Sequence, residues 1–331
     1  MAEFDDIDRQ LVHALHVDGR APFSRIASVL GVSDQTVARR YTRLRTAGRL
    51  RVVGLWQIGA RGDTGWTVRL QCVPGAVDDL GRALARRPDT MWVHALSGGA
   101  AMTFAARIPE DPDGTGEPSL LEQLPRTRQV TGVTVHSTLH MFFGGSQSPV
   151  GKSGALSAEQ VAALGDTPRD VRPVPPPLRR TEGDERLMAC LAEDGRAPVA
   201  DLAAATGWSQ TTVRRRLAEL LEHGAVYFDV ECDRRVFGKR TRAVLWLSVR
   251  PRLLEEAGRA LARHPEVAFA AATTGPTNLF ASVQCGDTAE LYRYLTTRVA
   301  ALDGVERIDT EPLTRTFKGV TPRGGGPAAR P

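Results

Sequence analysis

The sequence has few of the features that would place a protein outside the ordinary soluble class. Its 331 residues include only four cysteines, Cys72, Cys190, Cys232 and Cys285, which are far apart and form no Cys-x-x-Cys pair. This spacing argues against a disulfide framework or a zinc site and favours a reducing compartment. No stretch approaches about 18 consecutive apolar residues, and the acidic first ten residues lack the regions of a signal peptide. We therefore expect a soluble, cytoplasmic protein.

A strong charge of either sign is also lacking. The chain has 43 Lys and Arg against 38 Asp and Glu, a formal net charge of +5. This small excess does not by itself indicate a nucleic-acid partner, so the positions of the arginines matter more. The apolar share of 42% is enough for ordinary cores, and the length predicts more than one domain.

What the sequence does contain is an internal repeat. The segment Asp18–Pro22 (DGRAP) recurs as Asp194–Pro198, at an offset of 176 residues. Further along, Gly81–Arg86 (GRALAR) recurs as Gly258–Arg263 at an offset of 177. This period is far too long for a solenoid, so we infer a duplicated two-domain module. The offset of 176 also relates Asp8 to Asp184, Gly31 to Gly207, Ser33 to Ser209, and Arg39-Arg40 to Arg215-Arg216.

The first part of each copy has the pattern of a helix-turn-helix domain. In copy one, the apolar spacing predicts helices over 5–16 and 23–30 and a third helix from Ser33 to near Gly48. Gly31 supplies the tight turn before the third helix, and Ser33 can cap that helix. An apolar, β-rich run follows each third helix, over 50–56 and 225–230, and is compatible with a wing. Each copy is therefore predicted to begin with a winged helix-turn-helix.

The third helix of each copy presents polar side chains opposite its apolar stripe. Arginine, glutamine and threonine in such positions suit the major-groove edges and phosphates of DNA. A solvated basic helix is the alternative, but two copies with the turn and cap in register favour DNA. Residues 33–48 hold four arginines against one aspartate and residues 209–224 three arginines against two glutamates, so the first helix is expected to grip phosphate more strongly. The expected DNA contacts are Ser33, Gln35, Thr36, Arg39, Arg40, Thr42, Arg43, Ser209, Thr211, Thr212, Arg214, Arg215 and Arg216.

The second part of each copy reads as strand, helix, strand, strand, helix, strand, which is the ferredoxin-like order. The fold class is thus α+β, with two winged helix-turn-helix domains alternating with two ferredoxin-like sandwiches. One face of each sheet stays uncovered and invites sheet-to-sheet pairing, most of all at Ala243–Val249, which is apolar on both faces. The predicted domains are 1–58, 63–143, 181–236 and 240–320, with a Pro-rich linker at 144–180 containing one short helix, Ser157–Leu164, and a disordered tail at 321–331.

With these motifs in order, the chain resembles the leucine-responsive/AsnC (Lrp/AsnC) family of bacterial transcription regulators, in a tandem form. The resemblance rests on Asp8, Asp18-Gly19-Arg20, Gly31-Val32-Ser33, Arg39-Arg40 and Gly98, and on their counterparts in copy two, which include Gly275. It covers nearly everything except the linker and the tail. It implies double-stranded DNA as a partner and no enzymatic activity, metal or cofactor.

The resemblance also implies an amino acid or related small molecule as effector, bound at the turn between the second and third strands of a sandwich. The residues at these turns are Ser97, Gly98 and Gly99 in copy one and Thr274, Gly275, Pro276, Thr277 and Asn278 in copy two. The polar turn of copy two is the expected effector site. Where the family often has an acidic residue, this chain has Ala100, Ala101, Thr277 and Asn278, which weakens the case for an amino acid, above all in copy one.

Family members with a single module resemble dimers, and both modules here share one chain. A flexible linker of roughly 35 residues would span about 30 Å, and tethering raises the effective concentration to about the millimolar range. We therefore expect an intramolecular pseudo-dimer, with higher oligomers stacking such units. Its two recognition helices should read related but unequal half-sites about one helical turn apart.

Two other functions compete with a local regulator. Some proteins of this two-domain build are haem-biosynthesis decarboxylases, and His94 falls roughly where those enzymes carry a functional histidine. Copy two has Ala271 at the matching position, and the arginines of the third helices have no role in such an enzyme. A DNA-compacting architectural protein would share the same residues but lack sequence selectivity.

Three weaker signals are set aside. Gly151-Lys152-Ser153 resembles the end of a phosphate-binding loop, but Ser146 stands where that motif needs its first glycine. The pairs His13/His16 and His136/His140 have metal-ligand spacing. Surface positions on the first helix suffice to explain His13 and His16.

Overall fold

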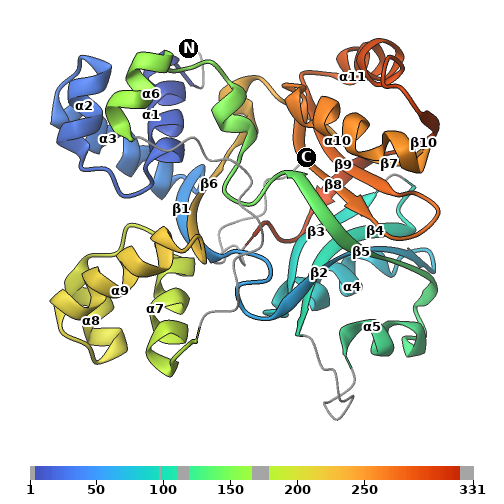
Figure 1. Ribbon diagram of the computed structural model, residues 1–331, viewed down its shortest axis with the longest axis horizontal. Coiled ribbons are helices and arrows are strands. Elements are labelled where there is room, and N and C mark those ends of the chain that lie inside the picture. Colours follow the sequence, from blue (N-terminus) through green and yellow to red (C-terminus); the bar gives the residue numbers. More distant parts are fainter. Residues whose placement is uncertain (1–3, 97, 110–118, 166–178, 321–331) are drawn as a thin grey trace. The chain divides into compact units, whose positions relative to one another are not determined.

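In the computed structural model the two copies are interleaved (Figure 1). The structure describes the chain except for residues 1–3, 97, 110–118, 166–178 and 321–331. Residues 1–61 and 144–239 form one compact unit, and residues 62–143 and 240–331 form another. Each unit contains a part of both copies. The helix-turn-helix regions thus form the first unit together, and the α/β regions form the second.

Each copy contributes three helices and one strand to the first unit. Copy one gives α1 (Asp6–Val17), α2 (Phe23–Leu30), α3 (Asp34–Thr46) and β1 (Leu50–Trp56). Copy two gives α7 (Glu182–Glu193), α8 (Val199–Thr206), α9 (Gln210–Glu222) and β6 (Val226–Cys232). Gly31 and Gly207 end α2 and α8 with φ angles of 67° and 74°, in the left-handed region that glycine adopts most easily. The predicted helix-turn-helix pattern is confirmed.

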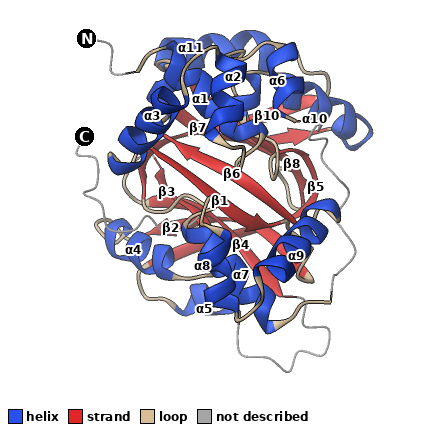
Figure 2. Ribbon diagram, turned by 90° about the vertical axis from the view of Figure 1, so that its left-hand side faces the viewer, coloured by secondary structure: helices blue, strands red, loops and turns tan. Residues whose placement is uncertain are grey.

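The strand after each third helix does not fold back as a wing within its own domain. Instead β1 and β6 pair antiparallel with each other, with Val52 opposite Val230 and Gly54 opposite Phe228. Figure 2 shows these two strands side by side, with α1–α3 on one side and α7–α9 on the other. A lone strand leaves its backbone N–H and C=O groups unpaired, and the counterpart from the other copy satisfies them.

The repeated DGR segment lies at this contact between the copies. In each copy the aspartate side chain accepts a hydrogen bond from the arginine N–H two residues later, at 2.9 Å, which shapes the turn. The arginine side chain then crosses to the same turn of the other copy. These hydrogen bonds run from Arg20 to the carbonyls of Gly195 (2.6 Å) and Ala197 (2.9 Å), and from Arg196 to those of Gly19 (2.8 Å) and Ala21 (2.9 Å). The two bonds in each direction give the contact an approximate two-fold symmetry.

The first part of the predicted linker is packed onto copy one rather than extended. It contains a 3-10 turn at Pro149–Lys152 and helix α6 (Ala158–Leu164), and its side chains Leu156 and Leu164 are buried in the same core as α1. His13 and His16, which we expected at the surface, lie buried beneath this segment. His13 Nδ1 accepts a hydrogen bond from the Leu156 N–H at 3.1 Å. The Pro-rich part of the linker, from Pro173 to Pro177, lies outside the described residues.

The His13 contact predicts a loss of stability in acid. Burial lowers the pKa of His13 below its ordinary value of 6.5, so the unfolded chain binds a proton more readily than the folded one. Stability should therefore fall as the pH drops below about 6.5. A His13→Asn variant keeps an acceptor in place of Nδ1 and should lose less thermal stability than the wild type between about pH 7 and pH 5. Equal losses in calorimetry would show that His13 carries none of the effect.

The second unit has the predicted strand and helix order twice. Copy one gives β2 (Asp63–Cys72), α4 (Val77–Arg86), β3 (Thr90–Leu96), β4 (Ala101–Pro109), α5 (Leu120–Gln123) and β5 (Val130–Phe143). Copy two gives β7 (Thr241–Val249), α10 (Leu254–Arg263), β8 (Val267–Thr273), β9 (Leu279–Cys285), α11 (Thr288–Tyr294) and β10 (Val305–Thr316). The strand orders β3-β4-β2-β5 and β8-β9-β7-β10 are equivalent. The α+β fold class is confirmed.

The two sheets join edge to edge into a closed eight-stranded barrel. The hydrogen-bonded seams are β5 with β8 and β3 with β10, so each copy supplies one partner to each seam and no sheet edge is left open. Val244 and Trp246, from the strand expected to form the seam, point into the barrel and pack with Leu96 and Ala101 of copy one. The apolar face of that strand therefore does meet the other copy, but the edge strands make the seam.

The second repeated segment, GRALAR, also lies at a contact between the copies. A Cβ added to Gly81 would come within 2.5 Å of the Phe317 ring, and one added to Gly258 within 2.2 Å of the Phe142 ring. Each glycine lies on a helix of one copy, and the phenylalanine that contacts it belongs to the other copy. The absence of a side chain at these two positions lets the aromatic ring of the other copy pack directly on the helix.

Candidate DNA interface and effector turn

The third helices, α3 and α9, expose the residues expected to contact DNA. Val37, Tyr41 and Leu44 are buried in copy one, as are the corresponding valine and leucines of copy two. Of the residues expected to contact DNA, the structure leaves exposed on these helices Gln35, Arg39, Thr42 and Arg43 in copy one and Thr211, Arg214 and Arg215 in copy two. A helix that contacts base edges in the major groove needs such polar side chains on the face opposite the core.

Several of the arginines that give α3 its charge are already paired. Arg40 contacts the carboxylates of Asp5 (2.6 Å) and Asp8 (3.0 Å), and Arg43 contacts Asp8 (2.6 Å). Burial opposes the charged form of Arg40, but its hydrogen bonds to the two aspartates outweigh burial and raise its pKa. Arg45 pairs with Asp194 at 2.8 Å. Arg40 and Arg43 therefore join α3 to the start of α1, and Arg45 joins α3 to the end of α7 in copy two.

In copy two a single arginine, Arg216, forms the corresponding ion pairs. Arg216 forms two hydrogen bonds with Asp184, at 2.7 and 2.9 Å, and reaches Glu219 at 2.9 Å. The bond to Asp184 is the largest of the effects that raise the pKa of Arg216. The only signal of this aspartate–arginine pair in the sequence is the repeat. The same offset of 176 relates Asp8 to Asp184 and Arg40 to Arg216.

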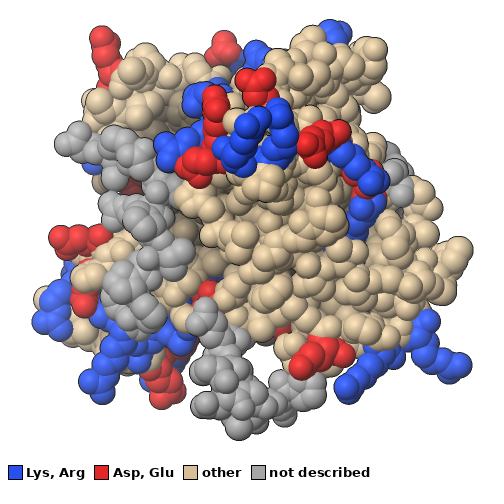
Figure 3. Space-filling view, turned by 45° about the vertical axis from the view of Figure 1, so that its right-hand side comes forward, with Lys and Arg blue, Asp and Glu red and all other residues tan. Residues whose placement is uncertain are grey.

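The excess of positive charge expected on the first helix is therefore largely balanced by aspartates of other elements, although Arg43 and Arg45 stay exposed. Among the described residues, Arg39 of α3 and Arg215 of α9 are exposed and have no ion-pair partner, and Arg214 contacts only the neutral side chain of Gln210 at 3.3 Å. Counting formal charges along a helix missed the aspartates from α1 and α7. In the view of Figure 3, Lys and Arg lie in separate groups, several of them beside Asp and Glu.

Four of the predicted contact residues cap the third helices. Ser33 Oγ accepts the Thr36 N–H at 3.2 Å, and Ser209 Oγ accepts the Thr212 N–H at 3.1 Å. In each copy the serine and threonine hydroxyls also lie 2.9 Å apart. The caps fix the first turn of each helix, where the helix dipole favours an anion.

Most polar groups of the predicted effector turn in copy two already have partners; the Thr277 hydroxyl has none among the described residues. Asn278 accepts from the Val249 N–H and donates to the Val249 carbonyl, both at 2.8 Å. The Thr274 hydroxyl accepts from the Ser137 N–H at 2.9 Å, and the Thr277 carbonyl accepts from the hydroxyl of Thr273 at 3.0 Å. The Pro276 carbonyl accepts from Ser248 at 2.8 Å. These residues therefore have structural roles, and effector binding by them stays a prediction.

The two turns differ in how closely they are covered. In copy two, His136 Nδ1 donates to the Thr274 carbonyl at 2.6 Å, and a Cβ on Gly275 would come within 2.8 Å of the same nitrogen. In copy one, Gly98 and Gly99 have φ angles of 90° and 65°, and a Cβ on either would meet open space. Ser97 lies outside the described residues. The turn of copy one is thus the more open of the two.

A polar cluster inside the barrel was not foreseen from the sequence. Arg242 lies 3.1 Å from His94 Nε2 and 3.1 Å from the Thr316 hydroxyl, and His94 Nδ1 lies 3.1 Å from the same hydroxyl. A guanidinium only donates, so His94 Nε2 accepts and the imidazole is neutral. His94 thereby connects β3 of copy one to β7 and β10 of copy two.

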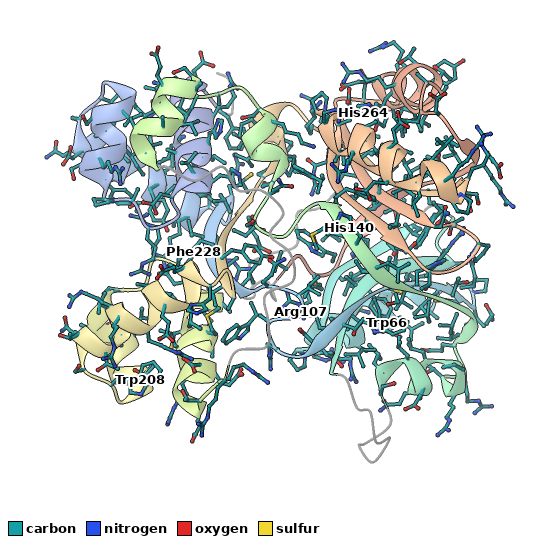
Figure 4. All side chains as sticks on the ribbon, viewed as in Figure 1. Trp66, Arg107, His140, Trp208, Phe228 and His264 are labelled. Carbon is teal, nitrogen blue, oxygen red and sulfur yellow. The ribbon has the colours of Figure 1, made fainter. Side chains whose placement is uncertain are left out.

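The described residues hold no group of three or more His, Cys, Asp or Glu arranged to bind a metal ion. The two members of the pair His136/His140 differ in burial, since His136 is buried and His140 (labelled in Figure 4) is exposed. No helix in the described parts of the chain is both long and apolar enough to cross a membrane.

Comparison with known families matches segments of both copies. The AsnC-type helix-turn-helix domain matches residues 4–45 and 181–221, and the Lrp/AsnC ligand binding domain matches residues 242–322. The first match covers α1–α3 and α7–α9, and the second covers the α/β region of copy two.

Two curated relatives are each similar to less than half of the chain. The HTH-type transcriptional regulator FL11 of Pyrococcus horikoshii is 26% identical over 141 residues, which are 42% of this chain and 93% of the relative. The HTH-type transcriptional regulator Rv2324 of Mycobacterium tuberculosis is 31% identical over 134 residues, 40% of this chain and 90% of the relative. Each relative therefore has about the length of one module.

Solved structures of one protein, NirDL, are similar to the chain over both modules. The siroheme decarboxylase NirDL superposes with a TM-score of 0.63 at 15% identity and covers 96% of this chain and 94% of its own. At this identity the similarity is one of fold.

Proposed function

The chain belongs to the Lrp/AsnC family of transcriptional regulators, and from this premise we propose that it binds specific DNA sequences and that a small molecule modulates this binding. The observation that supports DNA binding best is the pair of exposed third helices, each with an unpaired arginine at the same position, Arg39 and Arg215. The strands β1 and β6 join the two domains that carry these helices into one unit.

The approximate two-fold symmetry of this unit fits two half-sites on one duplex. The exposed positions of the two helices differ, however, since Gln35 corresponds to Thr211 and Thr42 to Ala218. Different side chains at the base edges favour different bases. We propose that one chain therefore reads two related but unequal half-sites.

Both helices should contribute to affinity. Replacing Arg39 with alanine should weaken binding to DNA from the upstream region of its own gene by roughly 1–3 kcal/mol if the arginine contacts a base, and by less if it contacts a phosphate. Arg215→Ala should have an effect of similar size, because both side chains are exposed and unpaired. Gel-shift titration measures both, with Arg259→Ala on α10 as a charge-matched control. If neither variant differs from the control, these helices are not the DNA interface.

Effector binding is proposed at the turns between the second and third strands, Ser97–Gly99 in copy one and Thr274–Asn278 in copy two. The family model for ligand binding that matches residues 242–322 supports this placement in copy two. Calorimetry with a panel of amino and keto acids tests it. Absence of heat with every compound in the panel would leave the turns with structural roles only.

We propose that the chain is not a decarboxylase. The curated relatives named above are transcriptional regulators, and His94 is engaged with Arg242 and Thr316. A related structure of NirDL is described as a complex with an iron-uroporphyrin III analogue. Titration with such an iron porphyrin, followed by visible absorption, distinguishes the two functions: tight binding that His94→Ala abolishes would favour the enzyme.

A further inference from the structure

A basic hollow lies where α7 and the recognition helix α9 begin. Its volume is about 470 Å³. It is lined by Arg179, Thr181, Trp208, Thr212, Arg215, Arg216 and Glu219. Arg179 precedes α7 and is not part of the recognition helix, so reading of base edges by α9 gives it no role.

The arginines of the hollow differ in whether they are free to bind. Arg216 is held by Asp184 and Glu219 and also donates to the Arg179 carbonyl at 3.2 Å. Its charge is thereby balanced within the protein. The side chains of Arg179 and Arg215 are exposed and have no ion-pair partner among the described residues. The hollow thus offers two guanidinium groups without an ion-pair partner, in addition to that of Arg216, whose charge is balanced.

An aromatic side chain forms one wall. Trp208, at the turn between α8 and α9 (Figure 4), packs so closely on Gly183 of α7 that a Cβ there would lie 2.0 Å from the indole. The corresponding residues of copy one, at the offset of 176, are Val32 and Ile7. The glycine in α7 therefore makes room for the indole, and copy one has aliphatic side chains at both positions.

The charge at the mouth of the hollow also differs between the copies. Thr181 caps α7 in copy two and donates its hydroxyl to Asp184 at 2.9 Å. The corresponding cap of copy one is Asp5, whose carboxylate pairs with Arg40. Copy two thus has a neutral cap where copy one has an ion-paired carboxylate, and Glu219, paired with Arg216, stands where copy one has Arg43.

We propose that this hollow holds one phosphate of the DNA backbone between Arg179 and Arg215, with the adjoining sugar against Trp208. The proposal rests on the proposed function and adds a contact that copy two alone can make. Guanidinium groups bind phosphate oxygens through paired, charge-assisted hydrogen bonds. The first turn of α9, which contains Thr212, adds the favourable end of a helix dipole. A contact of this kind fixes how deeply and at what angle the helix enters the groove.

The test compares variants of the full chain on a duplex that the wild type enriches from a random-sequence pool. Arg179→Gln should lower the affinity severalfold for this duplex and for versions of it with altered half-sites alike. It should reduce the slope of log affinity against log salt by about 1, as expected for one lost phosphate contact. Thr181→Asp keeps a good helix cap and should also weaken binding, because it brings the charge of copy one to the hollow.

Two control variants separate this effect from a general loss of charge or of the cap. Arg259→Gln, on the second unit, and Thr181→Ser, which keeps a neutral cap, should both bind like the wild type. An unchanged salt slope in Arg179→Gln, with the wild type binding normally, would overturn the phosphate contact alone. Failure of the wild type to enrich any duplex would overturn the proposed function and the phosphate contact with it.

Discussion

Replacing both Arg20 and Arg196 with alanine should lower the free energy of unfolding of the helix-turn-helix unit by at least about 3 kcal/mol. Each guanidinium donates two hydrogen bonds to backbone carbonyls of the other copy, at 2.6 to 2.9 Å. Hydrogen bonds from charged groups contribute roughly 1.5–3 kcal/mol each, and carbonyls left without a donor add a cost of their own. The exposed part of each side chain reduces the total through solvent screening. Urea denaturation measures the change.

Arg186→Ala is the matched control for this prediction. Arg186 lies on the exposed surface of α7, 3.6 Å from Glu182, in an ion pair of the kind that contributes only a few tenths of a kcal/mol. The double variant should also lose DNA affinity, because the two recognition helices would no longer be held in one arrangement. A double variant as stable as Arg186→Ala would mean that the repeated DGR segments do not join the copies.

Replacing Asp184 with alanine should destabilise the protein by about 3–5 kcal/mol. The carboxylate of Asp184 is fully buried and accepts both hydrogen bonds from Arg216, whose side chain is only 16% exposed. Without it, a largely buried guanidinium would keep only the partly exposed Glu219 as its counter-ion. Asp201→Ala, at an exposed position in the first turn of α8, should cost a few tenths of a kcal/mol.

The same carboxylate sets an acid limit to stability. Burial raises the pKa of Asp184, but the hydrogen bonds from Arg216 and Thr181 outweigh burial and hold it below the ordinary 3.8. Because the folded pKa is the lower one, the stabilisation is complete well above pH 3.8 and is lost as the pH falls below 3.8 and through the folded pKa. Asp184→Asn should therefore flatten the acid limb of the stability curve. If the acid limb of Asp184→Asn is as steep as that of the wild type, other carboxylates cause the loss of stability in acid.

Local patterns in the sequence were enough to predict the secondary structure of each copy. The sequence predicted a tight turn at each glycine and a helix cap at each serine. The structure has left-handed glycines at Gly31 and Gly207 and capping serines at Ser33 and Ser209. The same holds for the strand and helix order of the α/β regions, because apolar periodicity reports directly which face of an element is buried.

The contacts between the copies could not be predicted in this way. Pairing of β1 with β6 depends on which strand edges remain open once each domain has folded. The sequence of neither strand indicates which strand it will pair with. The ion pairs of Arg40 and Arg216 with aspartates of another helix were likewise not foreseen, and DNA contact by these two arginines stays a prediction. The available signal was the repeat itself, since the DGR and GRALAR segments both lie at contacts between copies.

The most direct test of the central claim is sequencing of the DNA that the purified chain selects from fragmented genomic DNA. A regulator with two unequal recognition helices should recover a limited set of sites, each with two related but non-identical half-sites about one helical turn apart. Arg39→Ala should lose the sequence preference of one half-site and keep that of the other. Recovery of all fragments alike, or of perfect palindromes in which Arg39→Ala weakens both halves equally, would contradict the claim.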